Sequence, residues 1–133
     1  MKTKKYDFLI KEAKALIEKR YCKSGHHTVV SAALLTKDGN VYSALNVGTY
    51  QPSISTCAEI IAIGMALKDN KNFKIEAIAC VRDNPAYIAS PCGKCREYIA
   101  DYSDDALVCV PVDDSYEFVP ISKLLPNKYV KKV

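Results

Sequence analysis

The segment Pro91-Cys92-Gly93-Lys94-Cys95 contains two cysteines three residues apart. Ser90 precedes it, and a serine followed by a proline is typical of a helix start, because proline suits the first helical turn. Side chains at positions i and i+3 of a helix are neighbours, so both thiols can point toward one metal ion. We therefore predict a helix from Ser90-Pro91 to about Asp101, with half of a metal site in its first turn.

A third cysteine also stands where a helix is predicted to begin. Residues 57–67 (CAEIIAIGMAL) are apolar on most sides, which predicts a buried helix that starts at Cys57 after the loop 48–55. A helix N-terminus favours thiolates through its dipole and its free N–H groups. Three sulfur ligands leave a tetrahedral zinc ion one ligand short, and an open position is typical of hydrolytic rather than structural zinc.

The residues around these cysteines offer two ways to use the fourth position. Glu59 follows Cys57 by two residues, and a carboxylate beside zinc is the usual group that moves a proton from water. Alternatively, His26 or His27, the two histidines of the chain, could complete the coordination, and the site would then be structural. The pattern of residue types leaves both possibilities open.

The remaining pattern predicts an α/β fold. Residues 7–20 place apolar side chains on one stripe with the period of an amphipathic helix. Apolar and β-branched runs predict strands, two of which form a hairpin around the turn Lys37-Asp38-Gly39-Asn40. The simplest architecture is one domain, 1–133, with a mixed sheet of about five strands and helices on both faces. The predicted strands are 28–36, 41–47, 75–82, 106–112 and 116–119, and a last helical turn is predicted near 121–125.

Composition and charge disfavour several classes of protein. The chain has 133 residues, 49% of them hydrophobic, and no apolar run near the roughly 20 residues that a membrane helix needs. The net charge is +4, but residues 24–127 carry more acidic than basic side chains, which disfavours a nucleic-acid-binding face. Because no signal-peptide pattern accompanies the six cysteines, we expect reduced thiols and a cytoplasmic location. Cys80 and Cys109 lie in apolar runs and are predicted to be core residues.

The spacing of the two cysteine segments is more specific than either segment alone. Cys57-Ala58-Glu59, followed 34 residues later by Pro-Cys-x-x-Cys, is the three-cysteine form of the zinc-deaminase signature. With this signature, the Asn46-Val47 pair and the segment 124–130 (LLPNKYV), the chain resembles the cytidine deaminase family over residues 26–130. Within that family it looks most like the blasticidin S deaminase branch. The resemblance implies a three-layer fold and a homotetramer whose sites neighbouring subunits complete.

The resemblance also implies a role for each motif residue. Cys57, Cys92 and Cys95 would bind Zn²⁺. Glu59 would carry protons from water to ring N3 and then to the departing amino group, so that a cytosine ring becomes uracil and ammonia is released. The implied substrate contacts come from Asn46, Ser31, Ala58 and Ser90.

Two departures from the family pattern concern charge and substrate. Nucleoside deaminases often have arginine after Cys-Ala-Glu, where this chain has Ile60, so Arg96 is the candidate to hydrogen-bond a zinc thiolate. The alternative for Arg96 is a surface or subunit contact. These deaminases also have a ribose-binding glutamate where this chain has Gly48. The substrate could therefore be cytidine, deoxycytidine or an antibiotic of the blasticidin S type, whose carboxylate could meet Lys128 or Tyr129.

Two other activities are alternatives to a deaminase of free nucleosides. One is an editing deaminase that acts on nucleic acid, which would use the same chemistry. The other is a nucleoside-binding protein that keeps the fold without turnover, although the intact Glu59 argues against it.

Overall fold

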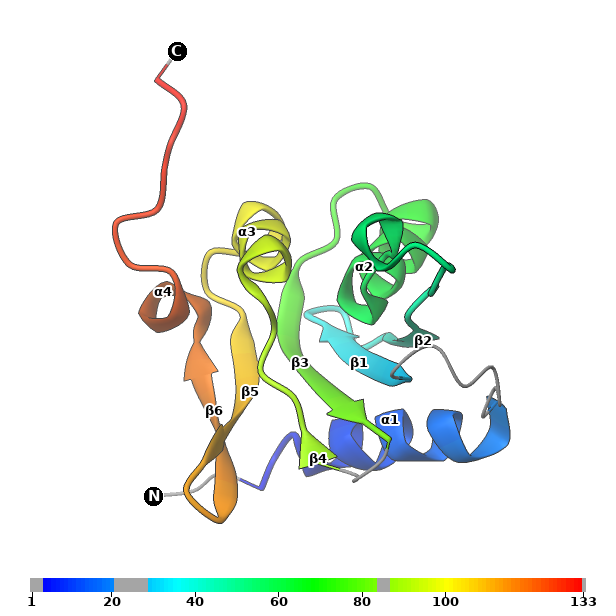
Figure 1. The fold of residues 1–133 in the computed structure, drawn as a ribbon. Coiled ribbons are helices and arrows are strands. Elements are labelled where there is room, and N and C mark those ends of the chain that lie inside the picture. The colour runs from blue at the N-terminus through cyan, green and yellow to red at the C-terminus, as the bar shows by residue number, and fades with distance from the viewer. Residues whose placement is uncertain (1–3, 21–28, 84–86, 133) are drawn as a thin grey trace.

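All five strands predicted from the apolar runs form in the computed structural model, which describes residues 4–20, 29–83 and 87–132. The strands of the described residues are β1 (Val30–Thr36), β2 (Val41–Leu45), β3 (Ile75–Arg82), β4 (Tyr87–Ile88), β5 (Leu107–Val112) and β6 (Ser115–Pro120). They make one mixed sheet in the order β2-β1-β3-β5-β6, and β4 pairs with β3 beside this path (Figure 1). The α/β prediction is confirmed, and the short strand β4 is the one that the sequence pattern missed.

The predicted hairpin is β1 and β2, which pair antiparallel with Ala33 opposite Ser43. Its turn uses Gly39 at a φ of 94°, a left-handed conformation that glycine adopts without steric cost. At the centre of the sheet, β3 pairs antiparallel with β1 and parallel with β5. Helices cover both faces of this strand, which explains why its sequence is almost continuously apolar.

The helices form layers on both sides of the sheet. They are α1 (Asp7–Arg20), α2 (Ala58–Asp69), α3 (Gly93–Tyr102) and the short α4 (Ile121–Leu124), with a 3₁₀ turn at Pro52–Ile54. Figure 1 shows α1 on one side of the sheet and α2 and α3 together on the other. This arrangement confirms the prediction of helices on both faces. No helix of the described residues is long and apolar enough to cross a bilayer.

Alternate residues of β3 divide between two cores. Ala77, Ala79 and Val81 pack on the α1 side with Leu9 and Ala13. Ile78 packs on the other side, in the core that α2, α3 and α4 share. Cys80 lies on that same side, beside Ala32 and Ala58 at the start of α2. Cys80 and Cys109 are buried, as predicted.

The start of α3 differs from the prediction in a way that matters for the site. The helix begins at Gly93 rather than at Pro91, and Cys92 is its N-cap residue, with extended backbone at φ −69° and ψ 171°. Proline favours an extended residue before it, so the chain stays extended through Ser90 and Pro91 before the helix begins. His26 and His27 lie outside the described residues.

Candidate active site

Three cysteine sulfurs meet where the N-termini of α2 and α3 lie side by side. The Sγ atoms of Cys57, Cys92 and Cys95 all lie within 4.8 Å of one another. Cys57 is the N-cap residue of α2, Cys92 is the N-cap residue of α3, and Cys95 is in the first turn of α3. Zinc–sulfur bonds of about 2.3 Å at tetrahedral angles place sulfurs roughly 3.8 Å apart, so the cluster needs only a small contraction to hold one ion.

The surroundings of the three thiols disfavour three thiolates together in the absence of a cation. Burial raises the pKa of Cys95 far above its usual range, and the Glu59 carboxylate raises it further. Burial also raises the pKa of Cys57. Burial acts in the same direction on Cys92, but hydrogen bonds from the backbone and thiol of Cys95 and from Cys57 outweigh it and lower the pKa of Cys92. One thiolate forms readily at the helix N-terminus, and a soft divalent ion would stabilise the other two.

Glu59 lies beside this cluster on the first turn of α2. Its side chain is only 5% exposed, and it borders the same cavity as Cys57 and Cys92. The sulfur trio is the one group of three possible metal ligands found among the described residues, so no carboxylate of that part of the chain joins it. Both histidines of the chain lie outside the described residues. The structure therefore offers Zn²⁺ three sulfur ligands, with the buried Glu59 carboxylate on the same cavity.

Sequence reasoning missed that Cys80 lies near Glu59. The Cys80 thiol is 3% exposed, and the Glu59 carboxylate is close enough to it to raise its pKa. Burial and that carboxylate raise the pKa of Cys80 well above its usual value, so the thiol stays protonated and remains a donor. The alternation of β3 could have put Cys80 on the α2 side, but pairing it with Glu59 requires the packed helix.

The cavity at this cluster has a volume of about 300 Å³, within the range of small-molecule sites. It brings together the predicted residues Asn46, Ala58, Glu59 and Ser90 with two of the cysteines. The full set of lining residues is Val30, Asn46, Pro52, Ser55, Thr56, Cys57, Ala58, Glu59, Ala89, Ser90 and Cys92. All are neutral except Glu59 and the ionisable thiols.

The loop between β2 and α2 supplies one wall, which the sequence did not reveal. Val47 and Thr56 form an isolated antiparallel bridge that closes this loop on itself. Within it, the Thr49 backbone N–H donates to the Ser55 hydroxyl at 3.1 Å. These bonds place Pro52 and Ser55 at the cavity. Their only signal in the sequence was turn composition, which locates a loop without saying what it faces.

Asn46 also borders the cavity and is held there by two contacts to the backbone of Val30. Its Oδ1 accepts a hydrogen bond from the Val30 N–H at 2.9 Å, and its own backbone N–H donates to the Val30 carbonyl at the same distance. This double contact fixes the amide group beside the cavity, where the resemblance placed a substrate contact.

Ser31 does not line this cavity. Its side chain is fully buried, and its hydroxyl donates to the backbone carbonyl of Ala13 in α1. Neighbouring residues of a strand point to opposite faces, so Ser31 faces α1 while Ala32 faces the site. The structure thus removes Ser31 from the predicted substrate contacts.

Arg96 also differs from its predicted role. Its Nε, Nη1 and Nη2 donate to the Pro91 carbonyl, the Leu124 carbonyl and the Ser90 hydroxyl, at 2.9, 2.9 and 3.0 Å. The guanidinium therefore binds oxygens rather than a zinc-site sulfur. The N-termini of α2 and α3 are what the structure provides against the negative charge of the thiolates.

Lys128 is paired with α3 rather than directed to the cavity. Its Nζ lies 2.7 Å from Asp101 Oδ1 and 3.5 Å from Glu97 Oε2. Tyr129 beyond it is 77% exposed, on a tail that runs away from the fold (Figure 1). Neither residue lines the cavity within this subunit.

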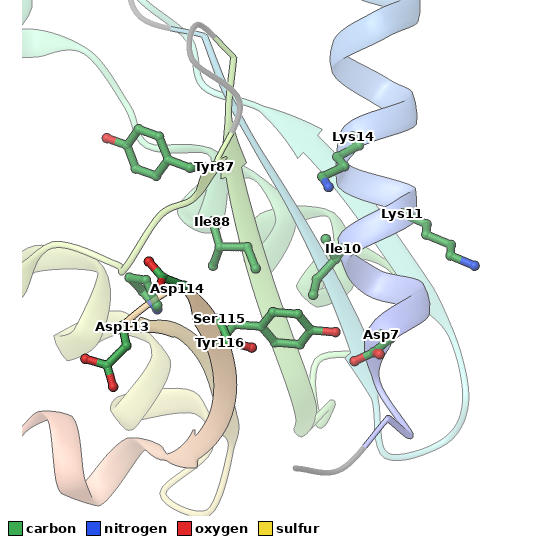
Figure 2. A pocket seen from close by; sticks show the side chains of 11 residues that line it. Asp7, Ile10, Lys11, Lys14, Tyr87, Ile88, Asp113, Asp114, Ser115 and Tyr116 are labelled. Carbon is green, nitrogen blue, oxygen red and sulfur yellow. The ribbon is translucent and has the colours of Figure 1, made fainter.

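A larger cleft of about 650 Å³ lies on the other face, between α1, β4 and the β5–β6 turn. Figure 2 shows the Tyr116 hydroxyl directed toward Asp7 and the Lys14 amine directed into the cleft. Tyr116 donates a hydrogen bond to Asp7, and this bond raises the pKa of Tyr116 to about 12. No cysteine or histidine is among the described residues that line the cleft, so it lacks the sulfur ligands of the smaller cavity.

Known proteins are similar to this chain in both sequence and fold. Residues 3–110 match the family described as the cytidine and deoxycytidylate deaminase zinc-binding region. The chain is 34% identical over 130 residues to the blasticidin-S deaminase of Bacillus cereus, covering 92% of this chain and 91% of that protein. It is 32% identical over 127 residues to the cytidine deaminase of Sporosarcina psychrophila, covering 93% and 90%. The crystal structure of cytidine deaminase from Mycobacterium tuberculosis matches with a TM-score of 0.78 and 25% identity, covering 97% of this chain and 100% of that one.

Proposed function

This chain belongs to the cytidine and deoxycytidylate deaminase family, and we propose that it deaminates a free cytosine nucleoside or a cytosine-containing nucleoside antibiotic. It is a hydrolytic deaminase with zinc as its cofactor, and the cysteine trio is able to hold that ion. The observation that carries the proposal is the burial of Glu59 in the same cavity as Cys57 and Cys92.

The proposed chemistry assigns the proton transfers to Glu59. Cys57, Cys92 and Cys95 would hold the zinc ion, which when bound would supply a water of lowered pKa as a nucleophile near neutral pH. The Glu59 carboxylate takes a proton from this water and passes it to ring N3 as oxygen attacks C4. It then takes the remaining proton from the hydroxyl now on C4 and delivers it to the amino group. The C4–N bond breaks as the C4 carbonyl forms, so that one water is consumed and one ammonia leaves. The protonated Cys80 thiol, buried beside Glu59, is a neutral donor that could help to orient the carboxylate.

The neutral lining of the cavity favours a substrate without a phosphate. Arginine and lysine are the side chains that usually bind phosphate groups. Neither is among the described residues that line the cavity, where Glu59 is the one acidic side chain. Burying a phosphate beside an uncompensated carboxylate is unfavourable. We therefore place cytidine, deoxycytidine and blasticidin S ahead of deoxycytidylate as substrates.

The residues that line the cavity suggest which groups contact the base and the sugar of the substrate. We assign the amino group of the base to a backbone carbonyl at Ala89 or Ser90, since both residues border the cavity next to Cys92. Sugar hydroxyls would meet the Asn46 amide and the hydroxyls of Ser55 and Thr56. These groups stand in for the glutamate that Gly48 replaces.

We further propose a homotetramer in the cytoplasm. Exposed apolar side chains on α2 and on the preceding loop support subunit contacts near the cavity: Met65 is 42% exposed, Ile54 68% and Tyr50 89%. A reducing compartment fits a site whose three thiols must stay free to bind metal.

An ultraviolet assay on purified, zinc-loaded protein tests the function. Cytidine, deoxycytidine, blasticidin S and deoxycytidylate are compared at equal concentration, with ammonia release as a second readout. We expect turnover of at least one of the first three and markedly lower kcat/KM for deoxycytidylate. Efficient turnover of deoxycytidylate alone would contradict the argument from the neutral cavity. Turnover of cytosine in an RNA or DNA strand, with no turnover of free nucleosides, would favour the editing alternative.

A further inference from the structure

Arg96 connects three oxygens that belong to separate parts of the chain. Its guanidinium donates to the Ser90 hydroxyl and the Pro91 carbonyl before α3, and to the Leu124 carbonyl at the end of α4. The planar guanidinium group has five N–H donors in a fixed arrangement, so one side chain can satisfy all three acceptors. A lysine ammonium has one nitrogen and cannot occupy these three positions together.

The first two acceptors are direct neighbours of site residues. Ser90 lines the cavity, and Pro91 is bonded to the proposed zinc ligand Cys92. Ser90 and Pro91 precede α3, and Cys92 is its N-cap residue, whose carbonyl accepts the Arg96 backbone N–H at 3.0 Å. The helix therefore holds the segment at Cys92, and the Arg96 guanidinium adds contacts to Ser90 and Pro91, which lie outside the helix.

The third acceptor provides a fixed anchor. Leu124 is the last residue of α4, and the final carbonyls of a helix have no partner within it. The helix itself is held by Ile121, which is 1% exposed in the core and whose N–H donates to the Ala106 carbonyl at 2.8 Å. Arg96 thus ties the segment 90–92 to an element that cannot shift without disturbing the core.

We infer that Arg96 is a positioning residue, which holds the segment carrying Ser90 and Cys92 against the C-terminal helix α4. This inference rests on the proposed function, because that function makes the segment both a zinc-binding and a substrate-binding wall. It makes the C-terminal helix part of the active site's support, although none of the described residues of α4 lines the cavity. It also replaces the predicted contact between Arg96 and a thiolate with a contact to backbone and hydroxyl oxygens.

Lys128 offers a matched control for this inference. Its short ion pair with Asp101, at the end of α3 away from Cys92, and its longer contact with Glu97 also join the C-terminal segment to α3. Lys128→Met therefore loosens the C-terminal segment from α3 but leaves Arg96 and its three acceptors unchanged.

The test compares Arg96→Met, Arg96→Lys and Lys128→Met in the full-length, zinc-loaded protein. The readouts are KM and kcat for cytidine, or for whichever nucleoside the wild type converts, and the rate of zinc loss to a chelator. For Arg96→Met we expect KM and the zinc-loss rate to rise about tenfold each, as for other groups that orient metal ligands, with kcat changed by less than about threefold. Arg96→Lys should show smaller changes in the same direction, and Lys128→Met should change neither quantity by more than about twofold.

Unchanged KM and zinc loss in both Arg96 variants would overturn the inference, even if the thermal midpoint fell. Equal changes in Arg96→Met and Lys128→Met would also overturn it, because the contact would then be general support. If Arg96→Met does not fold, Arg96→Lys carries the test. If the wild type converts no nucleoside, the proposed function fails, and the zinc-loss comparison still decides the role of Arg96.

Discussion

The two faces of the sheet carry cavities that differ in size and in chemistry. The α1 face has the larger cleft, about 650 Å³, with carboxylate, amine and phenol groups around it. The other face has a cavity of about 300 Å³, where three thiols and a buried carboxylate converge. The difference shows that the reactive site is marked by convergent functional groups rather than by volume.

The strand directions explain why convergence occurs on one face only. α2 leads into β3 and α3 leads into β5, and these two strands are parallel. Both helices therefore place their N-termini at the carboxyl ends of the parallel strands, the usual position of ligand sites in such sheets. α1 lies alone on the other face, so no second helix end meets it among the described elements (Figure 1).

The largest expected difference between the two faces comes from replacing a cysteine on each of them. Cys92→Ser removes a thiolate from the cluster, and we expect the protein to lose zinc and with it all activity above background. Cys109→Ser alters a buried thiol in the α1-side core, where it should lower stability by about 1 kcal/mol and leave zinc bound. Zinc content after dialysis and ammonia release measure both. Full zinc content in Cys92→Ser would contradict the sulfur site.

Replacing a carboxylate on each face separates proton transfer from metal binding. Glu59→Gln keeps the size of the side chain but cannot accept a proton, so kcat should fall by about 10³-fold while zinc stays bound. Asp114→Asn changes the rim of the larger cleft and should leave kcat and KM unaltered. Activity of Glu59→Gln within tenfold of the wild type would mean that another group moves the proton.

Two polar side chains, Asn46 at the cavity and Ser31 against α1, give the next largest expected effects. Asn46→Ala removes an amide from the cavity wall, and we expect KM to rise about tenfold, because the site loses a hydrogen bond to substrate. Ser31→Ala removes a hydroxyl that is buried against α1, and it should lower stability by about 1 kcal/mol with KM unchanged. Steady-state kinetics and urea unfolding distinguish these effects. A raised KM in Ser31→Ala would return this residue to the site.

The smallest expected effect is a pH dependence that belongs to the α1 face. Burial, followed by its hydrogen bond to Glu76, raises the pKa of Tyr6 from 10.0 to about 12. Since the folded pKa lies above the unfolded one, this stabilisation is complete below about pH 10 and disappears as pH rises through 12. Tyr6→Phe should therefore lower the unfolding free energy by about 1 kcal/mol near neutral pH and by progressively less above pH 10.

Urea unfolding at several pH values measures this difference, and Tyr98→Phe on the exposed side of α3 is the matched control. A difference between wild type and Tyr6→Phe that grows with pH above 10 would contradict the assignment. Neither variant should alter KM, because neither residue lines the smaller cavity.

Local patterns predicted most of the fold and the reactive group of the site. The hairpin followed from Lys37-Asp38-Gly39-Asn40, where glycine permits the turn, and α2 followed from an apolar run of helical length. The cysteine trio and Glu59 could be predicted because each of them lies within a few residues of a helix start that the local sequence indicates. The structure brings the three sulfurs together, and Glu59 borders the same cavity as Cys57 and Cys92.

The residues that sequence reasoning missed or misplaced depend on contacts between distant segments. Ser31 was assigned to the site because it belongs to a matching strand, but strand register points it at Ala13. Arg96 was assigned to sulfur because it follows Cys95, but the extended segment before α3 and the carbonyl of Leu124 offered better acceptors. Cys80 meets Glu59 only because α2 packs over β3. The sequence immediately around each of these residues does not indicate which distant segment it contacts.

The central claim is that three sulfurs hold zinc with one position open beside Glu59, and zinc K-edge X-ray absorption tests it most directly. For the zinc-loaded wild type, the account predicts three sulfurs near 2.3 Å and one lighter atom at about 2.0 Å, without the outer-shell pattern of imidazole. Four protein ligands that include an imidazole, or fewer than three sulfurs, would contradict it.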